Sequence, residues 1–113
     1  MERKREIIQF KNYFYKFYAS QEEKVKTKID YVLYLITVSD RIPIKFLKYI
    51  EGTDGLFEIR IKYESNIFRI FCCFDEGKIV VLFNGFQKKS NKTPKQEIKR
   101  ALLIKAEYFK QKK

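Results

Sequence analysis

Apolar residues between positions 20 and 40 recur every three or four residues, which predicts an amphipathic helix. Ser20, followed by Glu23 three residues later, has the pattern of a capping box at the start of this helix. We expect the helix to end near Asp40, because Pro43 follows closely. The apolar stripe consists of Val25, Ile29, Val32, Leu33 and Ile36.

The pattern changes to a period of two after residue 56, and this alternation predicts β-strands. We expect strands over residues 57–63, 67–74 and 79–86, joined as an antiparallel meander. The breaks between them, Ser65-Asn66 and Glu76-Gly77, are suited to two-residue hairpin loops. The second half of the chain therefore predicts a three-stranded sheet.

Further elements are expected at both ends of the chain. Residues 6–10 read as a short strand, and Asn12 is a candidate cap for a brief helix over residues 13–18. Thr93-Pro94 opens a last helix, because proline suits the first helical turn. Its apolar side, interrupted by Lys105, consists of Ile98, Ala101, Leu102, Tyr108 and Phe109.

These elements predict an α/β (α+β) fold, with residues 1–113 forming a single domain. The order is β–(α)–α–β–β–β–α, with an antiparallel sheet packed by the N-terminal helices and a C-terminal helix. Because 113 residues include 45% hydrophobic residues, the chain has ample material for a core.

Two-residue loops would place residue 64 opposite 67 and residue 75 opposite 78. Lys62 would then face Arg69, with Arg60 diagonal to it, and Arg69 would face Asn84 on the next strand. Phe86 would lie beside them, and Glu58 is the available counter-charge. The other face would be the core, formed by Phe57, Ile59, Ile61, Tyr63, Phe68, Ile70, Cys72, Phe74, Ile79, Val81 and Phe83.

The net charge of +11 is distributed unevenly along the chain. Ten Lys or Arg and two Glu lie between Lys88 and Lys113, a balance that favours a polyanionic partner such as nucleic acid. Phe86, followed by Lys88, Lys89 and Lys92, would bring a stacking ring and cations to the edge of the basic face, which suits single-stranded RNA. The alternative is a solvated face and a lysine-rich tail that aids solubility.

Few residues could hold a metal ion. The sequence has no histidine, and Cys72 and Cys73 are adjacent in a strand, so that their thiols should point to opposite faces. We interpret both as packing residues in a reducing compartment. A charged start followed by no long apolar run predicts neither a signal peptide nor a membrane span, and hence a cytoplasmic protein.

Four segments together resemble a known protein family. LFEIRI (56–61), NIFRIF (66–71), FNGFQKK (83–89) and TPKQEI (93–98) are similar to the phage-derived HigB-like branch of the RelE/ParE toxin superfamily. The strong match covers roughly residues 47–109. The specific feature is the ordered combination of two strand arginines, a pair of lysines after an aromatic, and a Thr-Pro helix start.

The resemblance implies a RelE-like fold and the toxin of a type II toxin–antitoxin system. It implies a ribosome-dependent mRNA endoribonuclease that needs no metal or cofactor and is neutralised by a helix-turn-helix antitoxin. By position, Arg60, Arg69, Lys88 and Lys89 match the catalytic cations, and Phe86 matches the aromatic before the lysine pair. Lys62, Asn84 and Lys92 complete the expected RNA-binding set.

The absence of histidine departs from some relatives and leaves the proton acceptor open. A lysine whose pKa is lowered by neighbouring cations could serve, at Lys88, Lys89 or Lys62, and Glu58 is a rival. Two other functions remain open as well. One is a ParE-like toxin that inhibits gyrase without nuclease chemistry, and the other is an inactive RNA-binding module.

Overall fold

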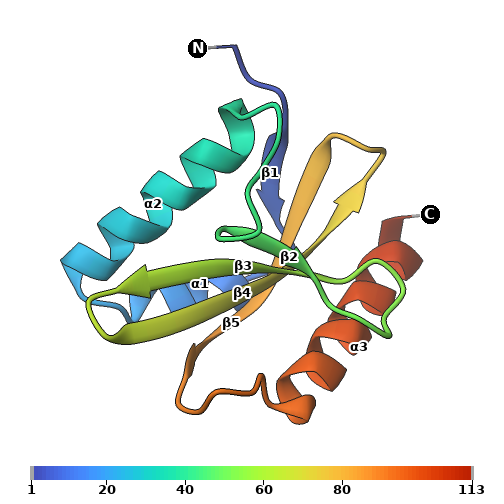
Figure 1. Ribbon diagram of the computed structural model, residues 1–113. Coiled ribbons are helices and arrows are strands. Elements are labelled where there is room, and N and C mark those ends of the chain that lie inside the picture. Colours follow the sequence, from blue (N-terminus) through green and yellow to red (C-terminus); the bar gives the residue numbers. More distant parts are fainter. Residues whose placement is uncertain (1, 113) are drawn as a thin grey trace.

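The computed structural model describes residues 2–112, which form a five-stranded sheet and three helices. Helices cover both faces of this sheet, with α1 and α2 on one side and α3 on the other (Figure 1). This confirms the predicted α+β class. In chain order the elements are β1 (Glu6–Gln9), α1 (Tyr13–Ala19), α2 (Glu23–Val38), β2 (Leu47–Tyr49), β3 (Phe57–Tyr63), β4 (Asn66–Asp75), β5 (Ile79–Lys88) and α3 (Lys95–Lys112).

The strand order in the sheet is β1-β5-β4-β3-β2. The three long strands form the predicted antiparallel meander, but β1 joins its edge in parallel with β5. The predicted antiparallel sheet therefore carries β1 as an additional, parallel edge strand. Strand β2 was not predicted, because three residues are too few to establish an alternating pattern.

Both hairpin registers differ from the predicted ones. The β3–β4 loop is Glu64-Ser65, one position earlier than expected, so that Tyr63 pairs with Asn66. The β4–β5 loop has three residues, since Asp75 pairs with Ile79, and a bulge near Ile70 shifts the register again. A loop longer by one residue reverses which face each side chain of β5 occupies up to the bulge, and the second shift there returns Phe86 to the face of Arg69.

That reversal gives the molecule two cores in place of the single apolar face expected. Ile79, Val81 and Phe83 were assigned to the same face as Ile59, but they pack on the other face with α3. The core under α1 and α2 includes the predicted α2 stripe, whereas Phe71 and Cys73 belong to the core under α3. The two free cysteine thiols therefore do point to opposite faces, as predicted.

The helix starts are only partly as predicted. Ser20 ends α1, its hydroxyl donating to the Phe17 carbonyl, and α2 begins at Glu23 after the N-cap residue Glu22. The expected capping box is thus wrong, because α1 lies directly before α2 and uses Ser20 at its own end. Asn12 precedes α1 but makes no side-chain cap bond. Helix α3 follows Pro94, as its sequence predicts.

Gly85 marks a close approach between β5 and α1. A Cβ atom added to Gly85 would lie 2.6 Å from the Phe17 ring, which is too close for any real contact. We expect Gly85→Ala to lower the free energy of unfolding by about 1–3 kcal/mol through overpacking. Urea unfolding measures this loss, and Phe17→Leu in the same chain should recover part of it. Equal losses with and without Phe17→Leu would contradict the proposed clash.

Candidate functional site

Arg60 of β3 and Arg69 of β4 lie directly opposite each other in the sheet. Their side chains are on the face that also carries α3, where α3 packs against β4 and β5. In Figure 1 this helix crosses the half of the sheet away from the β3–β4 hairpin tip, which leaves the other half for a site. The predicted pairing was Lys62 with Arg69; the earlier loop moves Arg60 into that place.

A buried carboxylate lies between the two arginines. Oε2 of Glu58 is 3.4 Å from Nε of Arg60 and 3.4 Å from Nε of Arg69. The Glu58 and Arg69 side chains are 7% and 6% exposed, while Arg60 is 29% exposed. Two like charges opposed in a sheet repel each other, so Glu58 is the counter-charge that makes this pairing tolerable. The three side chains together keep one net positive charge.

Contact with Glu58 holds the Arg69 side chain in place but does not use all of its hydrogen-bond donors. Its Nη1 donates to the Phe68 carbonyl at 3.1 Å, and its buried Nε makes no geometrically good hydrogen bond with any described residue. Burial is the main cause that lowers the pKa of Arg69, with Arg60 adding to the effect and Glu58 opposing it. A guanidinium remains charged in proteins, so Arg69 is a fixed cation with spare donor capacity.

Lys88 ends β5 and lies opposite Ile67, in line with the arginine pair. Burial and the neighbouring charge of Arg69 lower the pKa of Lys88 from its ordinary value, with smaller effects from Arg60 and Lys48. Nearby Glu58 partly opposes this shift. Lys88 is therefore the predicted proton acceptor that has both a lowered pKa and a position beside the arginines.

Phe86 lies opposite Arg69, in the position predicted for Asn84. Its half-buried ring stacks on Phe71, with ring centres 5.6 Å apart and planes inclined by 29°. Asn84 is 1% exposed, and its Nδ2 donates to Oε1 of Glu97 in α3 at 3.2 Å. Asn84, which the sequence predicted to contact RNA, is therefore buried under α3, because the bulge in β5 turns its side chain toward that helix.

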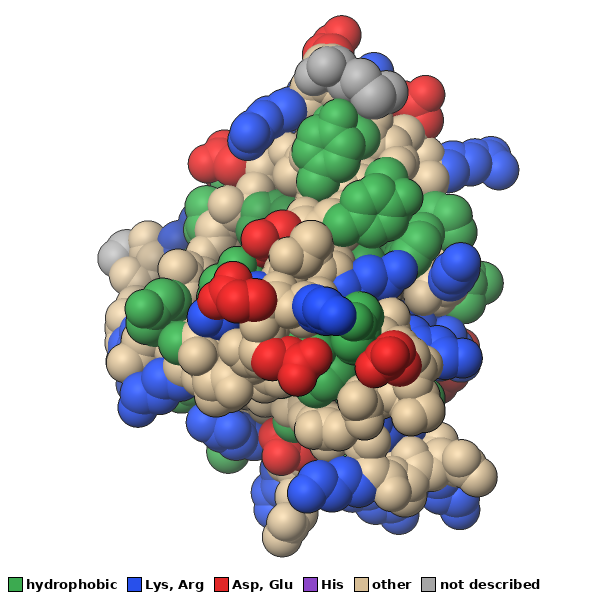
Figure 2. Space-filling view, turned by 90° about the vertical axis from the view of Figure 1, so that its left-hand side faces the viewer, with side chains coloured by type: hydrophobic (Ala, Val, Ile, Leu, Met, Phe, Trp, Pro, Cys, Tyr) green, Lys and Arg blue, Asp and Glu red, His purple; other side chains and the backbone are tan. Residues whose placement is uncertain are grey.

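The other predicted lysines lie at the margins. Lys62 is exposed near the end of β3, and Lys89 and Lys92 are exposed between β5 and α3. Figure 2 views the molecule from the side of the β3–β4 hairpin tip, and blue side chains gather at its lower end, where that segment lies in Figure 1. The segment between β5 and α3 contacts the site through Thr93, whose hydroxyl donates to Oε1 of Glu58 at 3.4 Å.

A cleft of about 250 Å³ opens beside the arginine pair. Five of its lining side chains are cationic and none is acidic, a composition that suits a phosphate group. Lys28, Lys45 and Phe46 could not be expected here from the sequence, because they come from α2 and from the segment before β2, far from the arginine strands along the chain. The full lining is Lys28, Lys45, Phe46, Arg60, Ile61, Lys62, Ile67 and Arg69.

Two further features of the described residues concern metal binding and membranes. No three His, Cys, Asp or Glu side chains within residues 2–112 come together as a metal site would need. No helix over the same residues is long and apolar enough to cross a membrane.

Comparison with known proteins gives one family. The family model of the phage derived protein Gp49-like (DUF891) matches residues 16–105, a span that includes α2, all of β2 to β5 and the start of α3. No curated protein matches the chain. The matched residues include Arg60, Arg69, Glu58 and Lys88. The chain therefore belongs to the phage-derived Gp49-like family, which is part of the RelE/ParE-like toxin superfamily.

Proposed function

We propose that this protein is the toxin of a type II toxin–antitoxin pair, of the HigB-like branch, and that it cleaves mRNA on the ribosome. The observation that carries the proposal is the pair of opposed arginines, both of which form ion pairs with Glu58. They lie beside a cleft that is lined by five cationic side chains. Membership of a toxin superfamily supports the same conclusion. The partners in this proposal are mRNA and a helix-turn-helix antitoxin, and the compartment is the cytoplasm.

The proposed reaction is an attack of an RNA 2′-hydroxyl on the adjacent phosphate. Neutral Lys88 accepts the hydroxyl proton while the 2′-oxygen forms its bond to phosphorus. The bond from phosphorus to the 5′-oxygen breaks, and cationic Lys89 protonates the leaving oxygen. The products are a 2′,3′-cyclic phosphate and a 5′-hydroxyl end, so no water or metal-bound oxygen enters the bond change.

The arginine pair supplies the electrostatic part of this reaction. The phosphorane that forms during attack carries more negative charge than the ground-state phosphate, and Arg60 and Arg69 offer fixed donors to it. Because Glu58 already holds them, little reorganisation is needed when charge develops. Glu58 itself is a poor proton acceptor in this scheme, since it is buried and both of its oxygens are engaged.

Two other functions compete with this proposal. A gyrase inhibitor would need a protein-binding surface but no proton acceptor, and an inactive RNA-binding module would need cations alone. The lowered pKa of Lys88 beside two arginines favours proton transfer over both. Incubation with translating ribosomes, naked mRNA and gyrase separates the three. New mRNA ends on ribosomes support the proposal, whereas gyrase inhibition or RNA binding without new ends contradicts it.

The role of Lys88 predicts a characteristic pH profile. Only the neutral amine accepts a proton, so the cleavage rate should rise by about tenfold per pH unit below the lowered pKa of Lys88. Lys88→Arg retains the positive charge but cannot lose its proton, and should lose both the rate and the pH dependence. The control is Lys24→Arg, at an exposed lysine of α2 outside the cleft, which should keep both the rate and the rising profile. A Lys88→Arg protein with an unchanged profile would contradict this assignment.

A further inference from the structure

The wall of the cleft opposite Arg69 is built by residues that the proposed reaction does not use. Lys28 comes from α2, and Lys45 and Phe46 come from the segment that leads into β2. With Lys62, they give this wall three lysines and one aromatic ring. Cations around an aromatic surface are what single-stranded nucleic acid needs, because phosphates and bases have to be bound together.

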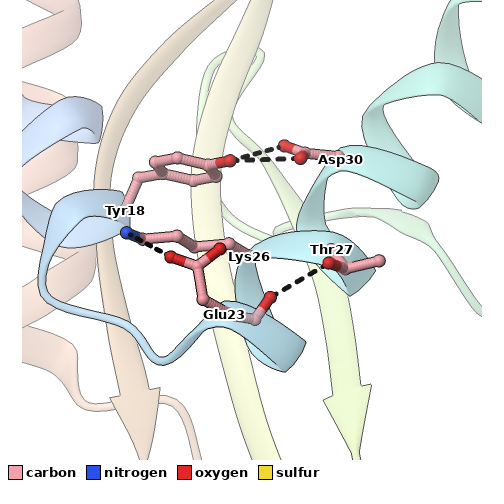
Figure 3. Close-up of polar contacts among 5 residues, drawn as sticks. All are labelled: Tyr18, Glu23, Lys26, Thr27 and Asp30. Carbon is pink, nitrogen blue, oxygen red and sulfur yellow. Dashed lines mark hydrogen bonds and ion pairs between the residues drawn. The ribbon is translucent and has the colours of Figure 1, made fainter.

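The acidic residues of α2 do not neutralise Lys28. Figure 3 shows Asp30 turned toward the Tyr18 hydroxyl, which donates to its two oxygens at 2.9 and 3.1 Å. It also shows Glu23 beside Lys26, at 3.5 Å. Lys28 forms no ion pair with any described residue, and its ammonium lies over the Tyr31 ring. Its charge therefore remains available to a ligand in the cleft.

Two other lysines of this wall also keep their charge available to a ligand. Lys45 and Lys62 also form no ion pair with a carboxylate in the described part of the chain. The Lys45 ammonium lies 5.4 Å from the centre of the Phe46 ring, and Phe46 is half-buried. Cation and ring thus stand together at the wall of the cleft.

Backbone contacts fix this wall relative to the arginine pair. The Arg60 backbone N–H donates to the Phe46 carbonyl at 2.8 Å. Arg60 Nη1 also lies 3.5 Å from the carbonyl of Ile44. A ligand held by Lys45 and Phe46 is therefore held at a set distance from the arginines. Such positioning raises a reaction rate when the reacting group is bound in the right geometry.

We propose that this wall is a subsite for one nucleotide of single-stranded RNA, next to the nucleotide whose bond is cleaved. Lys28, Lys45 and Lys62 bind its phosphate, and the Phe46 ring stacks on its base. The cleft volume of about 250 Å³ is too small for a duplex and fits a single unit of this kind. Its place next to the cleaved bond rests on the proposed function, whereas the binding of the nucleotide does not.

The test uses a labelled six-nucleotide RNA that 2′-O-methyl groups make resistant to cleavage. We expect Lys28→Ala combined with Lys45→Ala to weaken binding at least about tenfold and to lower the slope of log affinity against log salt by about 1.4. The matched control is Lys16→Ala combined with Lys24→Ala, which removes two exposed lysines outside the cleft and should change binding much less.

Phe46→Leu separates stacking from charge. It should weaken binding of the RNA about fivefold or more, with an unchanged salt slope, and should leave binding of inorganic polyphosphate unaffected. An equal loss of RNA and polyphosphate binding would overturn the stacking role. If the double lysine variant behaves like its control, the subsite itself is wrong.

Cleavage on ribosomes then distinguishes this proposal from the one it rests on. If the lysine variant raises KM and leaves kcat near wild type, both proposals stand. If the wild-type protein cleaves nothing but the variants still lose RNA binding, the subsite stands and the nuclease function fails. If the wild-type protein cleaves and the variants cleave with the same KM, the nuclease function stands and the subsite fails.

Discussion

Replacing Arg69 by alanine is expected to reduce the rate of mRNA cleavage about a hundred- to a thousandfold, the usual cost of removing one donor to a transition-state charge. Arg69 is the more deeply buried of the opposed arginines, and its Nε retains donor capacity. Its loss should therefore abolish toxicity, which growth arrest on induced expression measures.

The control for this prediction must separate chemistry from folding, because Arg69→Ala also removes one of the two cations beside Glu58. Arg69→Lys keeps the charge but loses the planar fork of donors, so it should be the more stable variant and still lose most of the rate. Full growth arrest by a stably folded Arg69→Ala protein would contradict the site.

Replacing Glu58 by glutamine is expected to have the largest effect on stability. The substitution leaves Arg60 and Arg69 opposed across β3 and β4 without a negative charge between them. Removing one partner of a buried ionic group leaves an uncompensated charge. Because Arg60 is 29% exposed, we expect a moderated loss of roughly 2–4 kcal/mol in the free energy of unfolding.

Urea unfolding at low and high salt measures this loss, which should be smaller at high salt because the arginines are then screened from each other. Glu51→Gln is the matched control, since Glu51 is exposed in the loop before β3 and should be neutral. A Glu58→Gln protein as stable as this control would mean that Glu58 does not hold the arginine pair together.

The periodic parts of the fold could be predicted from the sequence. The α2 stripe from Val25 to Ile36 is buried as expected, and the alternation in residues 57–63 marks β3 correctly. These patterns succeed because each one reflects burial on one side of a single element. The pairing of β1 with β5 depends on distant residues, so no local pattern reveals it.

The register could not be predicted with the same success, because it depends on one residue in a turn. A third loop residue, Lys78, and the bulge near Ile70 move Phe86 opposite Arg69 and turn Asn84 under α3. The arginines were found, because each is a charged residue flanked by apolar residues in a clearly marked strand. The wall of the cleft was missed, because Lys28 and Lys45 become neighbours of Arg60 only through tertiary packing.

The chemistry of the new mRNA ends tests the central claim most directly. Messenger RNA cut on translating ribosomes is recovered and offered to polynucleotide kinase with labelled ATP, without prior phosphatase treatment. Attack by the 2′-hydroxyl leaves 5′-hydroxyl ends, so the fragments should label at once, and the Arg69→Ala protein should give at least about a hundredfold fewer of them in the same time. Fragments that carry 5′-phosphate, and that label only after phosphatase treatment, would show hydrolysis by an activated water and would contradict the proposed reaction.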